Sequence, residues 1–179
     1  WILSELNSLV RFVDEGLEKY QITETARKIE EFTDVLSNWY VRRCRERYWG
    51  SDMTDDKKAA YATLAHVLTT LSKVIAPYVP FVAESIYQNI VRSVDKTAPE
   101  SVHLTSFPVC DDSLVDKDLE RNMERLTDVV VLGRSARNAA NIKNRQPLSK
   151  LYIISEGGEK FGGELTDILA DELNVKQVE

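Results

Sequence analysis

The sequence predicts a mainly α-helical chain, an up-down helical bundle over residues 1–146 followed by a small α/β appendage over residues 147–179. Gly and Pro number only seven and five in 179 residues, and Leu, Ala, Glu, Lys and Arg fill the stretches between them, which favours helix. Apolar residues recur at three- and four-residue steps, as on amphipathic helices. After Pro147 the composition becomes β-prone, so the appendage is expected to be the start of an incomplete α/β junction unit.

The first two helices are expected over residues 1–20 and from Ile22 to about Trp49. A single apolar stripe marks the first helix: Leu3, Leu6, Val10, Val13, Leu17 and Tyr20. Ile22 and Thr23 suit a hydrophobic staple and an N-cap for the second helix. Its own apolar stripe is Ala26, Ile29, Phe32, Leu36 and Tyr40.

After a turn at residues 50–52, a third helix begins near Asp55 and carries its apolar face to Ile75. Pro77 and Pro80 each lack a backbone donor, so they predict a kink or short break. The helical pattern then resumes to about Ile90, and a long loop spans residues 94–118.

A last long helix fits residues 116 to about 143, with Met123, Leu126 and Val130 on its apolar line. Beyond Pro147 the sequence predicts a strand at residues 151–154, a turn at Gly157 and Gly158, and a short amphipathic helix at 165–173. A further strand begins at Val175. Four long helices make the predicted bundle.

Charge and composition exclude several classes of protein. Residues are 43% hydrophobic and 29% charged, as in an ordinary globular chain. Cys44 and Cys110 have no paired spacing, which fits a reducing cytosol without disulfides. No apolar run reaches the roughly 18 residues of a membrane span, so we expect a cytoplasmic protein. Because the chain starts at Trp1 within a predicted helix, we also expect a piece of a longer protein.

The densest chemical signal lies at residues 39–49, where four arginines are set among four aromatic residues. They are Arg42, Arg43, Arg45 and Arg47 among Trp39, Tyr40, Tyr48 and Trp49. Arginine binds phosphate bidentately and aromatic rings stack on bases, so this mixture is typical of RNA contacts. The alternative is a solvated basic helix end that suits the helix dipole.

A second basic cluster lies near the end of the last long helix. The net charge of −6 argues against binding nucleic acid, but between residues 134 and 150 the charged side chains are all cationic. The candidate contacts there are Arg134, Arg137, Asn141, Lys143 and Arg145. In an up-down bundle the second and fourth helices run parallel, so the two clusters are expected to converge at one end.

The apolar lines of both helices turn cationic, at Arg43 and Arg47 on one and at Arg137 on the other. An unpaired buried arginine is very costly. Such residues therefore either pair with carboxylates of this chain or face an anionic partner, and the sequence leaves both open while favouring phosphate binding. Other carboxylates, such as Asp55 and Asp56, are interpreted as solvated helix faces.

No catalytic or metal site is expected in this chain. His66 and His103 stand far apart and outside any chelating spacing, and they are interpreted as structural. The sequence contains no nucleophile-elbow, dinucleotide or phosphate-loop motif.

Several segments together resemble the anticodon-binding domain of isoleucyl-tRNA synthetases, a class I family. The segments are Leu36-Ser37-Asn38-Trp39-Tyr40-Val41-Arg42-Arg43, Ile75 to Phe81 with Glu84, Ser101 to Leu104 with Phe107-Pro108, Leu132 to Ile142, and Arg145-Gln146-Pro147-Leu148. The Pro-broken helix is similar to that of valyl and leucyl enzymes too, whereas the Arg-rich helix end and the Arg-Gln-Pro-Leu junction favour the isoleucyl enzyme.

The resemblance implies a class I anticodon-binding bundle that holds tRNA(Ile) beside the remaining domains of the same, monomeric polypeptide. Those domains would perform aminoacylation with ATP and Mg²⁺; this fragment would hold no cofactor, because the family's ATP-site signatures, His-Ile-Gly-His and Lys-Met-Ser-Lys-Ser, do not occur in it. The alternatives are a helical protein-interaction module, or the equivalent domain of a valyl or leucyl enzyme.

Overall fold

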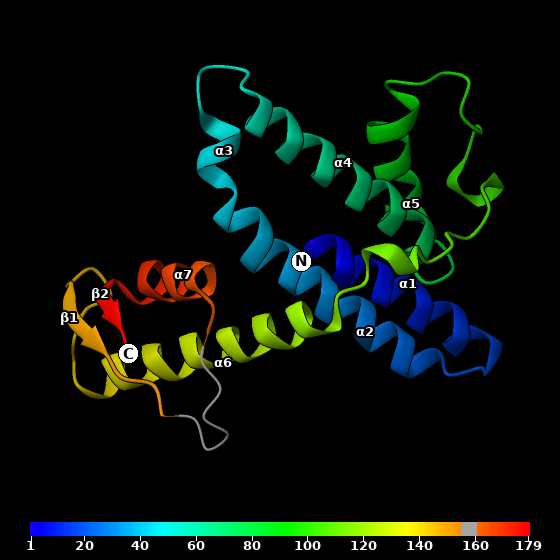
Figure 1. Cartoon of the computed structure of the whole chain (residues 1–179). Coiled ribbons are helices and arrows are strands. Elements are labelled where there is room, and N and C mark those ends of the chain that lie inside the picture. The colour runs from blue at the N-terminus through cyan, green and yellow to red at the C-terminus, as the bar shows by residue number, and fades with distance from the viewer. Residues whose placement is uncertain (155–160) are drawn as a thin grey trace. The chain divides into compact units, whose positions relative to one another are not determined.

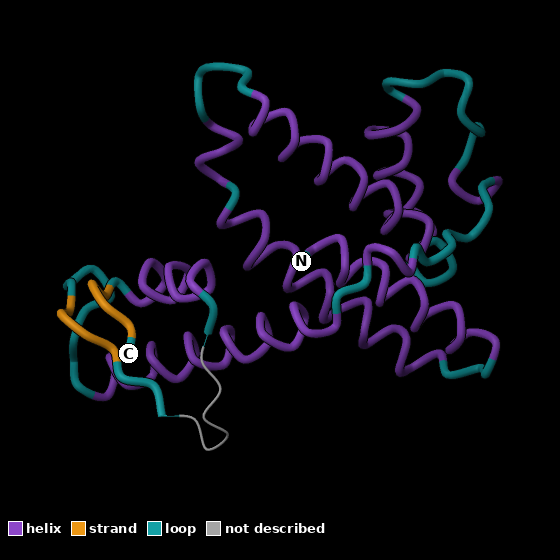
Figure 2. The backbone as a smooth tube through the Cα atoms, in the orientation of Figure 1, coloured by secondary structure: helices purple, strands orange, loops and turns teal. Residues whose placement is uncertain are grey.

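Helices dominate the structure, a computed structural model that describes residues 1–154 and 161–179 (Figure 1). The predicted mainly α-helical class with a small appendage is confirmed, and Figure 2 shows how little strand accompanies the helices. The chain divides into two compact units, Trp1–Val115 and Asp116–Glu179. The predicted turn at Gly157 and Gly158 lies outside the described residues.

Two antiparallel helices begin the first unit, α1 (Ile2–Glu18) and α2 (Ile22–Val35). The predicted stripe of α1 is buried at Leu6, Val10 and Val13. The two helices approach closely at Gly16, where an added Cβ would lie 2.3 Å from Cγ2 of Thr25. The buried Thr25 hydroxyl donates to the carbonyl of Gln21 at 2.8 Å and accepts from the Tyr78 hydroxyl at 2.6 Å.

The second helix differs from the uninterrupted one that the sequence predicts. It continues as a π-helix, η1 (Leu36–Val41), breaks at Cys44 with φ −80° and ψ 1°, and ends as a short α-helix, α3 (Arg45–Trp49). The residues of η1 are compatible with an ordinary helix, so their composition gives no sign of the change. π-helices are rare and often lie at functional sites. The break at Cys44 sets the direction of the two arginines that follow it, Arg45 and Arg47.

The rest of the first unit follows the predicted order. Helix α4 (Asp55–Ile75) starts with an N-cap, since the Thr54 hydroxyl accepts from the amide of Lys57 at 3.2 Å. The predicted break at the prolines is confirmed, with α5 (Pro80–Tyr87) starting at a proline and running into the π-helix η2 (Gln88–Arg92).

Glu84 of α5 holds the loop after η2 by hydrogen bonds. Its Oε2 accepts from the Ser101 hydroxyl at 2.8 Å and from the Val102 amide at 2.9 Å, at the start of the 3₁₀-helix η3 (Val102–Leu104). Burial raises the pKa of Glu84, but hydrogen bonds from Gln88, Ser101 and Val102 outweigh it and leave the pKa below its ordinary value. A second 3₁₀-helix, η4 (Asp112–Leu114), lies near the end of the unit.

The second unit begins with α6 (Lys117–Ala139), capped by the Asp116 carboxylate, which accepts from the Leu119 amide at 2.9 Å. The predicted apolar line is buried at Met123, Leu126 and Val130. The helix ends four residues earlier than expected. By compactness α6 falls in the second unit, whereas the sequence groups it with the bundle at residues 1–146.

A β-α-β segment completes the second unit. Strand β1 (Leu148–Leu151), helix α7 (Gly163–Leu173) and strand β2 (Val175–Val178) follow in order, and the strands pair in parallel with Leu148 opposite Val175. The first strand lies three residues earlier than the predicted run at 151–154, so that Leu151 is the one residue common to the two. Gly133 permits close packing of α6 and α7, because an added Cβ would lie 2.6 Å from Cδ1 of Leu173.

Within the described residues, no helix is both long and apolar enough to cross a membrane.

Candidate nucleic-acid interface

The first basic cluster lies on η1 and α3 and is built from two arginine–tryptophan pairs. The Arg42 guanidinium lies over the Trp39 ring, 5.6 Å from its centroid, and its Nε donates to the carbonyl of Asn38 at 2.8 Å. Arg45 lies over the ring of Trp49 at 5.3 Å. Both arginines are exposed, and Trp49 is 75% exposed. Each pair places a cation beside an aromatic ring, a combination that is common where proteins bind phosphates and stack on bases.

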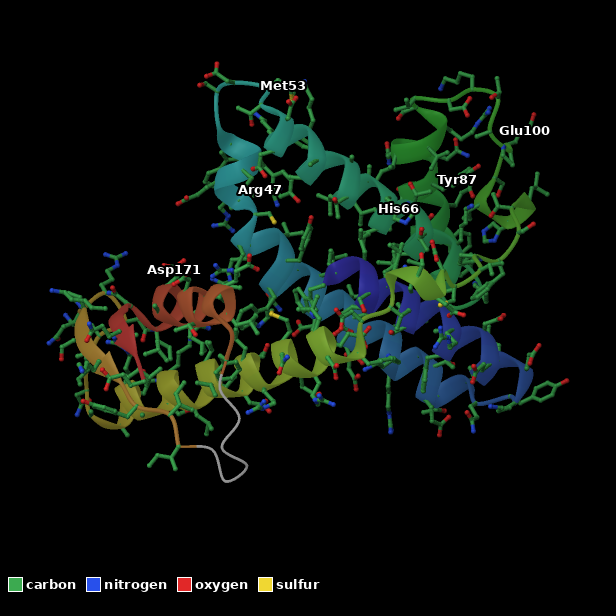
Figure 3. The ribbon with its side chains drawn as sticks, in the orientation of Figure 1. Arg47, Met53, His66, Tyr87, Glu100 and Asp171 are labelled. Atoms are coloured by element: carbon green, nitrogen blue, oxygen red, sulfur yellow. The ribbon has the colours of Figure 1, made fainter. Side chains whose placement is uncertain are left out.

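Arg47 has a different role, because it joins α3 to α4 (Figure 3). Its Nε and one terminal nitrogen donate to the two carboxylate oxygens of Asp56 at 2.8 and 2.7 Å, a bidentate pair. The hydrogen bond to Asp56 raises the pKa of Arg47, and the same bond lowers the pKa of Asp56. Asp56, interpreted from the sequence as a solvated carboxylate, is therefore the partner of a predicted RNA contact.

The hairpin formed by α3 and α4 is held by further contacts. The Lys57 ammonium donates to the carbonyl of Gly50 at 2.5 Å, and the Tyr61 hydroxyl donates to the carbonyl of Tyr48 at 3.4 Å. The Tyr48 and Tyr61 rings pack with centroids 5.2 Å apart. In Figure 1 the turn between these helices lies at the end of the unit away from the α1–α2 turn. The hairpin therefore presents its exposed side chains on a fixed backbone.

The inward and outward arginines alternate roughly as the helical period predicts. Arg43 and Arg47 are half-buried, while Arg42 and Arg45 are exposed. Arg43 also makes contacts inside the chain. RNA contact by Arg42, Arg43, Arg45 and Trp49 stays a prediction that this geometry permits.

In the second unit, Arg134 and Arg137 have partners inside the protein. A terminal nitrogen of Arg134 donates to Oε2 of Glu172 at 2.7 Å, and the Glu172 side chain is only 3% exposed. Arg137 is buried at 4% exposure. Its guanidinium donates to backbone carbonyls at four positions, Lys143, Gln146, Leu173 and Asn174. Of the two roles that the sequence leaves open for Arg137, the structure places it in the internal one.

The partners of Arg137 differ from those expected. The sequence predicts either carboxylates or an external anion, whereas the structure provides carbonyl oxygens at the end of α7 and in the loop after α6. A cation at a helix C-terminus is favoured by the carbonyl dipoles exposed there, and four acceptors satisfy the guanidinium without a second charge. Carbonyl partners have no side-chain identity, so no residue pattern could have indicated them.

The other candidates of this cluster, Asn141, Lys143 and Arg145, are exposed and lie in the loop between α6 and β1. Asn141 follows the helix end in the left-handed region, with φ 54°. Among the described residues, no carboxylate pairs with Lys143 or Arg145. The predicted convergence of the two basic clusters concerns two separate units and stays a prediction.

Comparison with known proteins agrees with this geometry. Residues 1–153 match the family model described as the anticodon-binding domain of tRNA ligase. The isoleucine–tRNA ligase of Clostridium novyi is 55% identical over all 179 residues, and that of Clostridium acetobutylicum is 52% identical over the same length. The isoleucine–tRNA ligase 2 of Bacillus thuringiensis is 46% identical over 177 residues. The chain spans only 16–17% of the length of these relatives.

Proposed function

The chain belongs to the family of anticodon-binding domains of tRNA ligases, and on that premise we propose that it is the tRNA-binding domain of an isoleucine–tRNA ligase. In this proposal it holds tRNA(Ile) while other domains of the same monomeric polypeptide join isoleucine to the tRNA in the cytoplasm. The names of the relatives support isoleucine over valine or leucine, since each is an isoleucine–tRNA ligase and the match covers nearly the whole chain.

The observation that carries the proposal is the pair of arginine–tryptophan contacts within residues 39–49, one at the end of η1 and one on α3. A chain with a net charge of −6 has no general attraction for RNA, so binding depends on local groups. Arg42 and Arg45 supply exposed guanidinium groups, and the Arg47–Asp56 pair fixes the helix α3 that carries Arg45. Contacts to phosphate fix the position and orientation of an RNA without reading its sequence. The hairpin is therefore suited to orienting the tRNA.

The catalytic work is assigned to the other domains. The sequence lacks the family's two ATP-site signatures, and the described residues contain no group of three or more His, Cys, Asp or Glu side chains that could hold a metal ion. In this proposal ATP and Mg²⁺ bind to the domains that carry those signatures, and no catalytic residue is named within this chain.

Competition among RNAs tests the proposal. The purified chain should bind a tRNA(Ile) transcript, and unlabelled tRNA(Ile) should displace it at lower concentration than tRNA(Val) or tRNA(Leu). Equal competition by all three would refute isoleucine specificity. Equal competition by heparin, a polyanion that is not an RNA, would favour a protein-interaction module for acidic partners instead. Fluorescence anisotropy with end-labelled tRNA gives all four affinities in one series.

A further inference from the structure

The loop between α6 and β1, residues 140–147, is held by hydrogen bonds at its start and in its second half. Helix α6 ends in a Schellman motif, in which the Asn141 amide donates to the carbonyl of Asn138 at 3.1 Å and the Ile142 amide donates to that of Arg137 at 2.9 Å. The motif requires a left-handed residue, and Asn141 supplies it with φ 54°. The chain thus leaves the helix along one defined path.

The buried guanidinium of Arg137 fixes the rest of the loop. It donates to the carbonyls of Lys143 at 3.1 Å and Gln146 at 3.0 Å. The amide group of the Asn174 side chain donates to the carbonyl of Asn144 at 3.2 Å, and the Gln146 amide donates to the carbonyl of Lys143 at 2.9 Å. These bonds engage three carbonyls of the loop, those of Lys143, Asn144 and Gln146, and the donor to two of them is the buried Arg137.

The side chains of this loop are directed away from that interior. Five polar side chains within six positions are exposed: Asn141, Lys143, Asn144, Arg145 and Gln146. Over residues 1–154 and 161–179, none of these five side chains has a hydrogen-bond or ion-pair partner, although all can form such bonds. Ile142 between them is half-buried. The loop therefore offers three carboxamides and two cations on a rigid backbone.

This combination suits unpaired RNA better than a duplex. A carboxamide carries donors and an acceptor, which match the edges of bases, and bases are accessible to proteins mainly where the RNA is single-stranded. Lysine and arginine at alternate positions supply charge for the adjoining phosphates. The Arg137 clamp stabilises the unit, and it also fixes the loop before any ligand binds, so that contacts made by the side chains of the loop cost less ordering entropy.

We propose that residues 141–146 form a recognition loop that reads unpaired nucleotides of the bound tRNA. Asn141, Asn144 and Gln146 contact base edges, and Lys143 and Arg145 contact phosphates. The inference rests on the proposed function and adds to it a site for sequence reading, separate in the chain from the arginines of the α3–α4 hairpin.

Three substitutions in the whole chain test the proposal: Asn144→Ala, Gln146→Ala and Asn141→Gly. Glycine adopts the left-handed conformation without cost, so Asn141→Gly removes the carboxamide and keeps the loop. Each variant should bind a tRNA(Ile) transcript about 5- to 150-fold more weakly, the range for one lost bidentate base contact. Binding to a blunt-ended RNA duplex should not change. The matched control is Asn89→Ala, an exposed carboxamide on η2, which should bind both RNAs as the unaltered chain does.

The outcomes separate this inference from the proposed function. If the unaltered chain binds tRNA(Ile) selectively but the three variants bind it equally well, the loop does not read bases and only this inference fails. Equal weakening of tRNA and duplex binding would also overturn it, because the loop would then contact backbone alone. Failure of the unaltered chain to bind tRNA(Ile) would remove the proposed function and this inference together.

Discussion

Replacing Arg137 with methionine should destabilise the second unit by about 2–4 kcal/mol. Four carbonyls lose a donor, but those of Lys143 and Asn174 keep bonds from the amides of Gln146 and Leu148, at 2.9 and 3.0 Å. Within the described residues, the carbonyls of Leu173 and Gln146 accept no other hydrogen bond than the one from Arg137, at 2.6 and 3.0 Å, and both lose it. A hydrogen bond to a charged group contributes about 1.5–3 kcal/mol. The Leu173 bond is buried and counts in full, while water can partly replace the other.

Thermal and urea unfolding, followed by far-ultraviolet circular dichroism, measure this loss. For a chain of this size, 2–4 kcal/mol corresponds to a fall of about 4–16 °C in the melting temperature. The matched control is Arg145→Met, the same substitution at an exposed site of the same unit, which should change stability by less than about 0.5 kcal/mol. Equal melting of the two variants would show that the clamp contributes nothing and that Arg137 has been misassigned.

Three further outcomes follow from the described contacts. Arg45→Ala should weaken tRNA binding and reduce the slope of log affinity against log salt by about 0.7–0.9. Arg47→Ala should mainly lower the melting temperature, because the Arg47 guanidinium is already paired with Asp56. The reverse pattern would contradict the assignment of Arg45 to RNA binding and of Arg47 to the fold. Glu84→Gln should cost about 1–2 kcal/mol at neutral pH. The lowered pKa of Glu84 means that its stabilisation is present above the ordinary value of 4.5 and is lost as the pH falls through the lower folded value, so the two proteins should converge in acid unfolding curves. Isoleucine-dependent exchange of pyrophosphate into ATP should be absent from the purified chain, and any such exchange would show that the chain holds a catalytic centre.

Much of the fold could be predicted because local signals agree with it. The start of α4 near Asp55, the break at Pro77 and Pro80 and the apolar line of α6 each rest on the chemistry of a few neighbouring residues. The π-helix at residues 36–41 could not be predicted, because its side chains suit an ordinary helix and the change depends on how the surrounding helices pack. The early start of β1 is similar, since its first bond joins the Leu148 amide to the carbonyl of Asn174, far away in the sequence.

For the candidate site, too, the sequence predicted what depends on neighbouring residues and not what depends on distant ones. Spacing alone identified which arginines turn inward, and Arg43, Arg47 and Arg137 are all at least half-buried. What the spacing could not supply was the partner of each one. Asp56 is nine residues from Arg47, across a turn, and Glu172 is 38 residues from Arg134. The helical period of a sequence indicates which way a side chain points, but only the tertiary fold determines which group it meets.

Internal pairing limits how much of the basic surface remains for RNA. The sequence predicts eight cationic contacts, but Arg47, Arg134 and Arg137 bind groups inside the protein. With those three paired, at most five of the predicted cations contact phosphate: Arg42, Arg43, Arg45, Lys143 and Arg145, of which Arg42 and Arg43 also have partners inside the chain. At about 0.7–0.9 per phosphate, the slope of log affinity against log salt should be no steeper than about −4.5, whereas eight contacts would give about −7. A measured slope near −7 for tRNA(Ile) would require the paired arginines to leave their partners on binding. A slope no steeper than about −4.5 would mean that those arginines stay paired and stabilise their own units, while fewer side chains bind the RNA.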